Sequence, residues 1–262
     1  MGNDFTAEKY PKIRKATVDL LKAARRKNMI HSFIEVDITE ARSALRQLKR
    51  ESKGFISFTA YIIYCVAKTV ENYKHIHAYR DRRNRLIMFD DVDVSTTIER
   101  KVDERNEVVA MIVRSANKKS IAAISEGIRQ EKNKNTDSAE VYRSIKRYLS
   151  IPAFIRRLIF RLLDRSPGQM KKRAGTVMVT SGNMIGRGAG WGLPIASHTL
   201  NITIGSIVDR FVIIEGRPES REHLCLTISF DHDIIDGAPA ARFTRQFKKI
   251  MEEGKPNDIR RQ

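Results

Sequence analysis

The most apolar stretch of the chain, residues 55–73, limits the possible folds more than any other segment. Ala60, Ile63, Ala67 and Val70 recur within it at helical spacing, which predicts a buried central helix. No apolar run in the sequence approaches the roughly 20 residues that a membrane-spanning helix requires. We therefore expect this helix to lie in the core of a globular protein.

Shorter helical and extended patterns flank the central helix. Further helices are predicted over residues 13–27, 39–53 and 238–253, and from about residue 120. Strands are predicted over residues 31–38, 86–89, 92–98, 108–113, 175–181, 201–208, 210–215 and 223–230. A turn rich in Arg and Asn is expected at residues 80–85.

The two cysteines and the first nine residues bear on the cellular compartment of the protein. Cys65 lies in a predicted helix and Cys225 in a predicted strand, and both segments are apolar, as is usual for unreactive buried thiols. Residues 1–9 are polar and lack the apolar stretch of a secretory signal. We therefore expect a cytoplasmic protein.

The sharpest local pattern is a histidine at the exit of a predicted strand. His232 follows the strand over residues 223–230, and Asp236 and Gly237 come just before the last helix. A loop held between rigid elements exposes its side chains and positions them firmly, which suits catalysis. Gly237 permits a tight turn.

This pattern closely resembles a known family signature. His232-x-x-x-Asp236-Gly237, within residues 226–243, is similar to the signature of the catalytic cores of dihydrolipoyl acyltransferases from 2-oxo acid dehydrogenase complexes, in the chloramphenicol acetyltransferase-like superfamily. Other similar segments, in the family's order, are residues 13–16, 109–125, 175–186 and 193–205. The resemblance covers residues 11 to 254. One catalytic domain over residues 1–262 is expected, without lipoyl or subunit-binding domains.

The resemblance implies both a fold and a reaction. The fold is of the α/β class, a two-layer structure in which a mixed β-sheet is flanked by helices. It assembles as a homotrimer with active sites between subunits. Coenzyme A enters one side of a tunnel and the acyl acceptor enters the other. His232 is expected to act as general base on a thiol or hydroxyl that attacks the thioester, because a neutral imidazole works near operating pH.

A hydroxyl on a neighbouring strand is expected to stabilise the tetrahedral oxyanion. By resemblance, this Ser or Thr lies on the strand over residues 177–181, where Ser181 is the first choice and Thr180 the second. Residues 182–186 depart from the family's usual spacing, which leaves the choice open. A strand hydroxyl that only packs is the alternative.

Asp236 and Asp233 raise separate questions. The resemblance implies a structural ion pair between Asp236 and Arg14 of the first helix, which would support the loop. The family usually has arginine directly after the histidine, and here that residue is Asp233. A carboxylate aimed at His232 would favour the imidazolium and reduce the free base. A structural histidine in an inactive core is therefore the alternative for His232.

Positive charge is concentrated in one segment. The chain has 49 Lys and Arg against 31 Asp and Glu, a net charge of +18, and half of this excess lies in residues 143–173. Within a predicted helical insertion at about residues 133–173, one helical stripe is apolar: Ile155, Leu158, Ile159 and Leu162. A parallel stripe is basic: Arg157, Arg161 and Arg165. This helix either packs on the body of the protein or docks on an acidic carrier or an anionic membrane.

Three functions remain open at this point. The first is a freestanding transferase that uses acyl-coenzyme A and a small acceptor, and the second is a core that uses a lipoyl group on a separate acidic carrier. The third is a scaffold with little or no activity, bound to an acidic partner or membrane and peripheral to it. Nucleic acid is disfavoured because the basic clusters lack interleaved aromatics. No histidine spacing resembles a zinc site, so no metal is expected; His75 and His77 follow a helix C-terminus, where cations are favourable.

Overall fold

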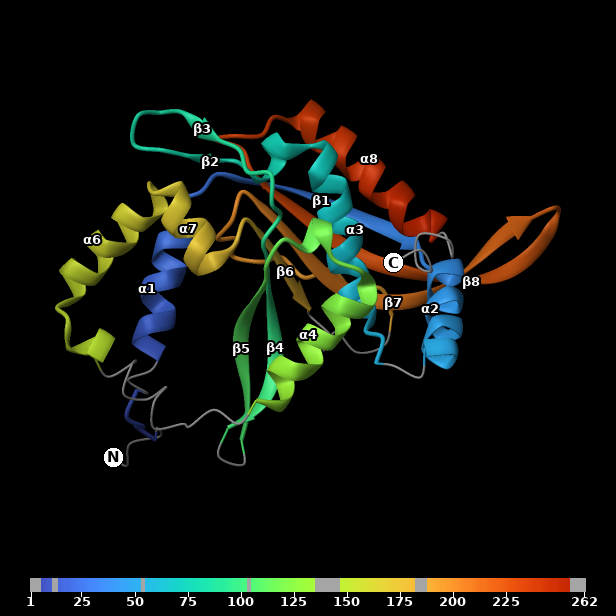
Figure 1. The fold of residues 1–262 in the computed structure, drawn as a ribbon, viewed down its shortest axis with the longest axis horizontal. Helices are drawn as coiled ribbons and strands as arrows, with labels where there is room; N and C mark the ends of the chain where they lie inside the picture. Colours follow the sequence, from blue (N-terminus) through green and yellow to red (C-terminus); the bar gives the residue numbers. More distant parts are fainter. Residues whose placement is uncertain are drawn as a thin grey trace, which may run out of the picture.

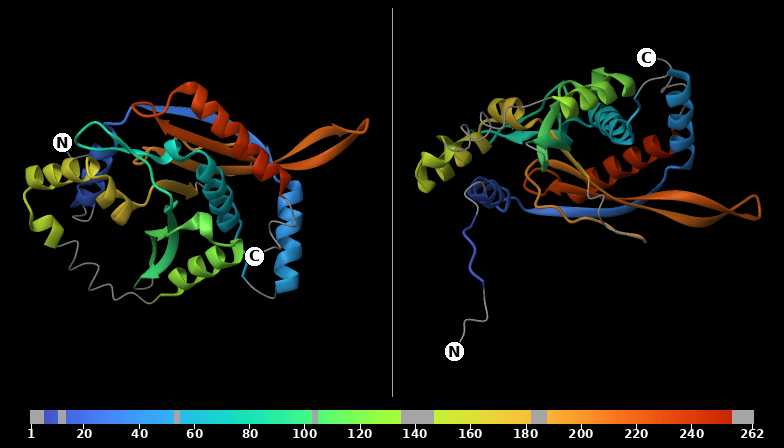
Figure 2. Two further views of the ribbon diagram at one scale, coloured as in Figure 1. Left: turned by 45° about the horizontal axis from the view of Figure 1, so that its top comes forward. Right: turned by 90° about the horizontal axis from the view of Figure 1, so that it is seen from below.

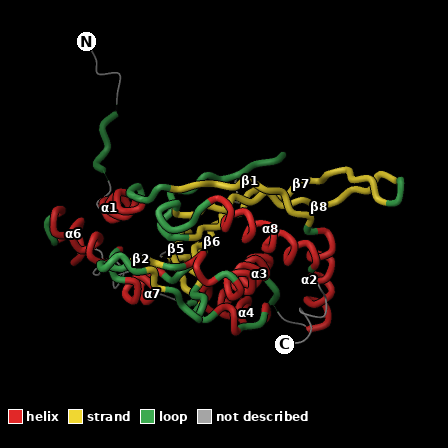
Figure 3. The backbone as a smooth tube through the Cα atoms, turned by 90° about the horizontal axis from the view of Figure 1, so that it is seen from above, coloured by secondary structure: helices red, strands yellow, loops and turns green. Residues whose placement is uncertain are grey.

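A six-stranded mixed sheet forms one layer of the molecule, and helices α3, α4 and α8 cover one of its faces (Figure 1). The computed structural model describes residues 6–10, 14–52, 55–102, 105–134, 147–181 and 188–254 of the 262-residue chain. Seen from above, the strands and these helices separate into two layers (Figure 3). The predicted α/β fold with a helix-flanked mixed sheet is confirmed.

The sheet has the strand order β1-β8-β7-β6-β4-β5. Its strands are β1 (Met29–Asp37), β4 (Val94–Val102), β5 (Arg105–Val113), β6 (Val177–Ser181), β7 (Leu200–Ile214) and β8 (Arg217–Asp231). Strand β6 runs parallel to β4 and β7, and the other pairs are antiparallel. A separate small hairpin joins β2 (Tyr79–Arg80) to β3 (Leu86–Ile87).

The helices begin and end close to the predicted positions. They are α1 (Arg14–Ala24), α2 (Thr39–Ser52), α3 (Phe58–Asn72), α4 (Ile121–Asn133), α6 (Ala153–Asp164), α7 (Pro167–Ala174) and α8 (Gly237–Glu253). Helix α3 is the predicted central helix, and Ile62, Ile63 and Val66 within it are fully buried. None of the described helices is both long and apolar enough to cross a bilayer.

Strand β7 differs from the prediction. Residues 201–208 and 210–215 were expected to form two strands, but a single 15-residue strand runs through them. Asp209 does not interrupt it, because this residue lies opposite Glu222 in the exposed part of the β7–β8 ladder, where a charged side chain remains in water. The far end of this β7–β8 hairpin projects beyond the rest of the sheet (Figures 1 and 3).

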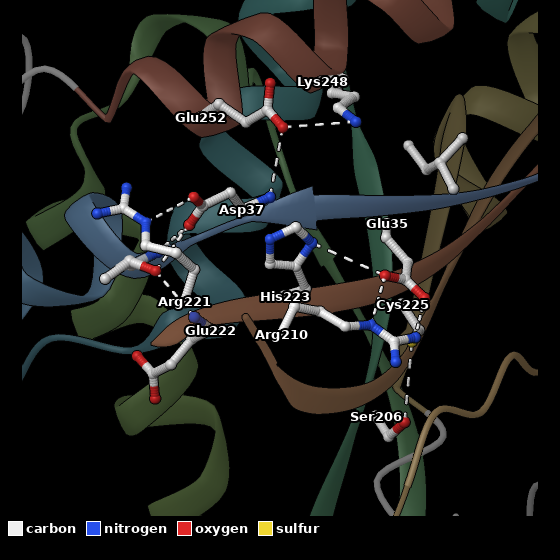
Figure 4. A network of polar contacts seen from close by, with 12 residues as sticks. Glu35, Asp37, Ser206, Arg210, Arg221, Glu222, His223, Cys225, Lys248 and Glu252 are labelled. Atoms are coloured by element: carbon white, nitrogen blue, oxygen red, sulfur yellow. Dashed lines mark hydrogen bonds and ion pairs between the residues drawn. The ribbon is translucent and has the colours of Figure 1, made fainter. Parts of the chain in front are cut away.

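A polar network near the base of this hairpin joins β1 to β7 and β8, and joins β1 to α8 where the Asp37 amide donates to Glu252 Oε1 at 3.3 Å (Figure 4). Arg221 Nε donates to Asp37 Oδ2 at 2.8 Å, and Arg210 Nε donates to Glu35 Oε2 at 3.0 Å. Burial raises the pKa of Asp37, but hydrogen bonds from Thr39 and Arg221 outweigh burial and hold this pKa below its usual range. The Asp37 carboxylate therefore stays ionised at neutral pH.

Helices α6 and α7 lie within the predicted basic segment and beside α1, away from the main helical layer (Figure 2). Arg156 Nε lies 2.7 Å from Asp19 Oδ2, and both side chains are buried, so Arg156 faces α1 rather than solvent. The apolar stripe of α6 stays partly exposed, with Ile155 and Ile159 at 36%, Leu162 at 45% and Leu158 at 51%, and Phe154 beside it is 71% exposed. Part of the segment, including Arg143 and Lys146, lies outside the described residues.

Candidate active site

The loop that carries His232 is fixed by the two strands beside β8. The backbone amide of Asp231 donates to the carbonyl of Thr199 at 2.9 Å, just before β7. The amide of His232 donates to the carbonyl of Asn28 at 2.6 Å, just before β1. The histidine therefore leaves the sheet at a place where three chain segments meet.

The His232 ring has one nitrogen engaged by its own loop. Nδ1 lies 3.0 Å from the carbonyl oxygen of Ile235. Because a carbonyl oxygen can only accept, this contact selects, of the two neutral tautomers, the one with the proton on Nδ1. Nε2 then carries the lone pair, and the side chain is 46% exposed, so this nitrogen can accept a proton from an incoming group.

Asp236 does not form the predicted ion pair. Its side chain is 88% exposed, and Oδ1 lies 3.8 Å from His232 Nδ1. Arg14 is exposed at the start of α1, and no ion pair joins it to Asp236 in the described part of the chain. The described residues of one chain therefore do not form the Arg14–Asp236 pair, and Asp236 stands at the N-cap position of α8 and faces solvent.

The buried carboxylate of the loop is Asp231. Lys27 Nζ lies 2.6 Å from Asp231 Oδ2, and their side chains are only 12% and 3% exposed. Lys27 was missed by the sequence analysis. The only signal for it was a run of three cations at residues 25–27 after the first helix, which does not show which one points inward.

Asp233, the unusual residue after the histidine, is held by a different partner. Asn28 Nδ2 donates to Asp233 Oδ1 at 2.8 Å. The described residues show no hydrogen bond or ion pair between Asp233 and His232. The Asp233 carboxylate is therefore hydrogen-bonded to Asn28 and not to the His232 imidazole.

Thr180 and Ser181 lie at the end of β6, far from His232 of the same chain. Thr180 is opposite Thr203 of β7, which is opposite Thr227 of β8, and His232 is five residues further along. Strands advance about 3.3 Å per residue and neighbouring strands lie about 4.8 Å apart, so five residues along and two strands across separate the Cα atoms of Thr180 and His232 by roughly 19 Å. Thr180 Oγ1 lies 3.4 Å from Thr203 Oγ1, whereas Ser181 is exposed. One chain alone does not bring the predicted base and oxyanion donor together.

The comparisons with known proteins decide the family. The model of the 2-oxoacid dehydrogenases acyltransferase (catalytic domain) family matches residues 2–140 and 143–259. The chain belongs to this family. The resemblance found in the sequence is therefore confirmed.

Two acetyltransferases are similar to this chain, one compared by sequence and one by fold. The acetyltransferase component of the pyruvate dehydrogenase complex from Mycoplasma pneumoniae is 27% identical over 201 residues, which is 76% of this chain and 42% of that protein. This chain thus spans less than half the length of that relative. A probable dihydrolipoamide acetyltransferase from Listeria monocytogenes has the same fold, with a TM-score of 0.70, 19% identity and 97% of both chains covered.

A third similar structure comes from the core of a multienzyme complex. The structure of the cubic core of the pyruvate dehydrogenase multienzyme complex matches with a TM-score of 0.68 and 16% identity, over 95% of this chain and 93% of that one. At this identity the match establishes the shared fold.

Proposed function

We propose that this protein moves an acyl group between a coenzyme A thioester and a thiol or hydroxyl acceptor, with His232 as general base. The observation that carries the proposal is the Nδ1 contact with the Ile235 carbonyl, because this contact leaves Nε2 free to accept a proton. A histidine that served only the core would be buried and bonded through both nitrogens, as His77 is.

The reaction then follows from two groups of the protein. Nε2 of His232 takes the proton of the acceptor, whose sulfur or oxygen attacks the thioester carbonyl carbon. The Ser181 hydroxyl, with Thr180 as the second choice, donates to the oxyanion that forms. When the tetrahedral intermediate collapses, the C–S bond to coenzyme A breaks and the imidazolium returns its proton to the departing sulfur.

The proposed active unit is a homotrimer with its sites between copies. This arrangement is supported by the separation of roughly 19 Å between the Cα atoms of His232 and Thr180 in one chain, since the base of one copy can meet the hydroxyl of another. The exposed apolar side chains of the projecting hairpin also support association: Phe211 is 82% exposed and Ile213 is 68% exposed.

A thiol-release assay tests the catalytic role. Acetyl-coenzyme A and other acyl donors are offered with small thiols and alcohols, and free coenzyme A is measured for wild type and His232→Ala. Loss of a general base lowers turnover by about 10²–10⁴. His75→Ala removes another partly exposed ring outside the loop and should keep the wild-type rate. Equal rates for His232→Ala and wild type would exclude the proposed base.

The acceptor is either a small molecule or a lipoyl group on a separate acidic carrier. A carrier that docks through charge should lose its turnover steeply as salt rises, whereas a small neutral acceptor should not. The assay is therefore run with free dihydrolipoamide and with a dihydrolipoylated domain between about 50 and 500 mM salt, a range over which the screening length falls below 10 Å. Carrier-dependent turnover that ignores salt would contradict electrostatic docking.

A second candidate function is attachment of a cytoplasmic, weakly active or inactive core to an anionic membrane. The observation that favours it is the exposed apolar surface of α6, where Phe154 and Leu158 lie one turn apart beside a row of cations. Binding to vesicles that contain phosphatidylserine should be lost in Phe154→Glu/Leu158→Glu. Val108→Glu, at a residue that is 70% exposed on β5, is the matched control. Equal binding of both variants would remove this function.

A further inference from the structure

A cavity of about 670 Å³ opens beside the loop that carries His232. Its lining includes Asp231 and Asp233, the two neighbours of the histidine. The other walls come from the end of α1, the β2–β3 hairpin and α6, which are far apart in sequence. Small-molecule sites have volumes of about 300–1,000 Å³, so the cavity can hold a ligand.

Five arginines line this cavity, and none forms an ion pair with a described residue. They are Arg26, Arg80, Arg82, Arg161 and Arg165. Two of the four lining carboxylates have cationic partners, Asp231 with the lining residue Lys27 and Asp81 with Arg85 at 2.7 Å, whereas Asp233 accepts a hydrogen bond from the neutral amide of Asn28. Asp164 is the remaining carboxylate. The lining thus holds six cations, the five arginines and Lys27, against four carboxylates, which leaves a net charge of +2.

Guanidinium groups that converge without carboxylate partners repel one another, and this cost falls when an anion sits among them. The planar fork of arginine matches the oxygens of phosphate, to which it can donate two parallel hydrogen bonds. Two of the arginines, Arg161 and Arg165, are one turn apart on α6 and so present their side chains on the same face. This arrangement fits a ligand with two or more closely spaced phosphate charges.

We infer that this cavity binds a phosphorylated group of one of the two substrates and thereby positions that substrate beside His232. The inference rests on the proposed function only in assigning the group to a substrate. The phosphate can belong to the coenzyme A donor or to the acyl acceptor. Both sources share the chemistry that the five arginines recognise.

Binding of inorganic pyrophosphate tests the cavity without any turnover. Calorimetry on the full chain is carried out in His232→Ala, which keeps the cavity arginines, and then in His232→Ala with Arg161→Gln and Arg165→Gln. We expect the double arginine change to weaken pyrophosphate binding at least tenfold. Arg157→Gln, on the same helix but outside the cavity lining, should leave the Kd within about twofold, since screened surface charges contribute little.

Two outcomes would overturn the inference. One is wild-type protein that fails to bind pyrophosphate at millimolar concentration. The other is equal weakening by the control Arg157→Gln and by the paired change, which would indicate general attraction to a chain of net charge +18. Neither outcome depends on whether His232 is a base, so failure here is distinct from failure of the proposed function.

Kinetics with a truncated donor identifies the source of the phosphate. Acetylpantetheine lacks the phosphates of acetyl-coenzyme A but keeps the thioester. If the donor supplies the phosphate, Arg161→Gln/Arg165→Gln should raise the KM for acetyl-coenzyme A at least tenfold and leave the KM for acetylpantetheine unchanged. If the acceptor supplies it, both donors keep their KM and the variant loses its preference for phosphorylated over neutral acceptors.

Discussion

Lys27 Nζ lies 2.6 Å from Asp231 Oδ2, directly before the histidine loop, and this pair is almost completely shielded from water. Lys27→Met should leave the Asp231 carboxylate buried without its partner. Breaking a buried pair in this way costs about 3–5 kcal/mol of the free energy of unfolding. Chemical denaturation at neutral pH measures the loss.

An exposed pair provides the control for this change. Lys74 Nζ lies 2.6 Å from Asp90 Oδ1, but their side chains are 46% and 89% exposed. Lys74→Met should therefore change the stability little, because water already screens this pair. A similar loss for Lys27→Met and Lys74→Met would contradict the structural role of the Lys27–Asp231 pair.

Because His232 and Ser181 lie far apart within one chain, two inactive variants are expected to restore activity when they are mixed. His232→Ala supplies an intact Ser181, and Ser181→Ala supplies an intact His232. If the site lies between copies, co-refolding the two variants at equal amounts should restore about a quarter of wild-type turnover, the share of interfaces that pair both intact groups in a random cyclic assembly. Mixing that restores nothing would place both groups in the same chain.

The hairpin variants test the surface that holds copies together. Phe211 and Ile213 lie two residues apart on β7 and so point to the same side of the hairpin. Phe211→Glu/Ile213→Glu should shift the protein to a smaller species in light scattering, because charges then replace buried apolar contacts. Glu219→Ala, an exposed change on β8, should keep the wild-type mass.

Two buried histidines predict loss of stability in mild acid. Burial lowers the pKa of both His77 and His198 to about 4. An unfolded histidine titrates near pH 6.5, so the unfolded chain binds more protons between about pH 6.5 and pH 4. Stability is therefore complete above pH 6.5 and falls, by several kcal/mol in all, as the pH decreases to about 4.

Denaturation midpoints across this pH range provide the measurement. His77 and His198 hold the segment before β6 through Thr176 Oγ1 and the Ala174 carbonyl. Glutamine at both positions cannot titrate there and keeps a hydrogen-bond donor. His77→Gln/His198→Gln should lower the stability at pH 7 but flatten its dependence on pH. An unchanged slope would show that other groups cause the acid sensitivity.

Much of the fold could be predicted because its signals are local. The helical spacing of residues 55–73 and the strand before His232 depend on neighbours along the chain, and both elements were found. The position of His232 at the exit of β8 followed from the same local pattern. The prediction for His77 failed, since its burial depends on contacts with Thr176, 99 residues away, and not on its place after a helix.

The ion pairs of the site could not be predicted for the same reason. Which aspartate of the loop is buried depends on Lys27, which is 204 residues from Asp231 in sequence. Motif resemblance directed attention to Asp236, but it contains no information on which side of the loop faces solvent. The cavity arginines likewise come from three separate segments that only the fold brings together.

The buried contact between Arg156 and Asp19 joins α6 to α1. Arg161 and Arg165 lie at the C-terminal end of α6, and Lys27, which pairs with Asp231 before the histidine loop, follows α1. The Arg156–Asp19 contact therefore connects one wall of the cavity to the segment that holds this loop. If the cavity positions a substrate as inferred above, substitution of Arg156 or Asp19 would change which molecules are accepted without altering any of the proposed catalytic side chains.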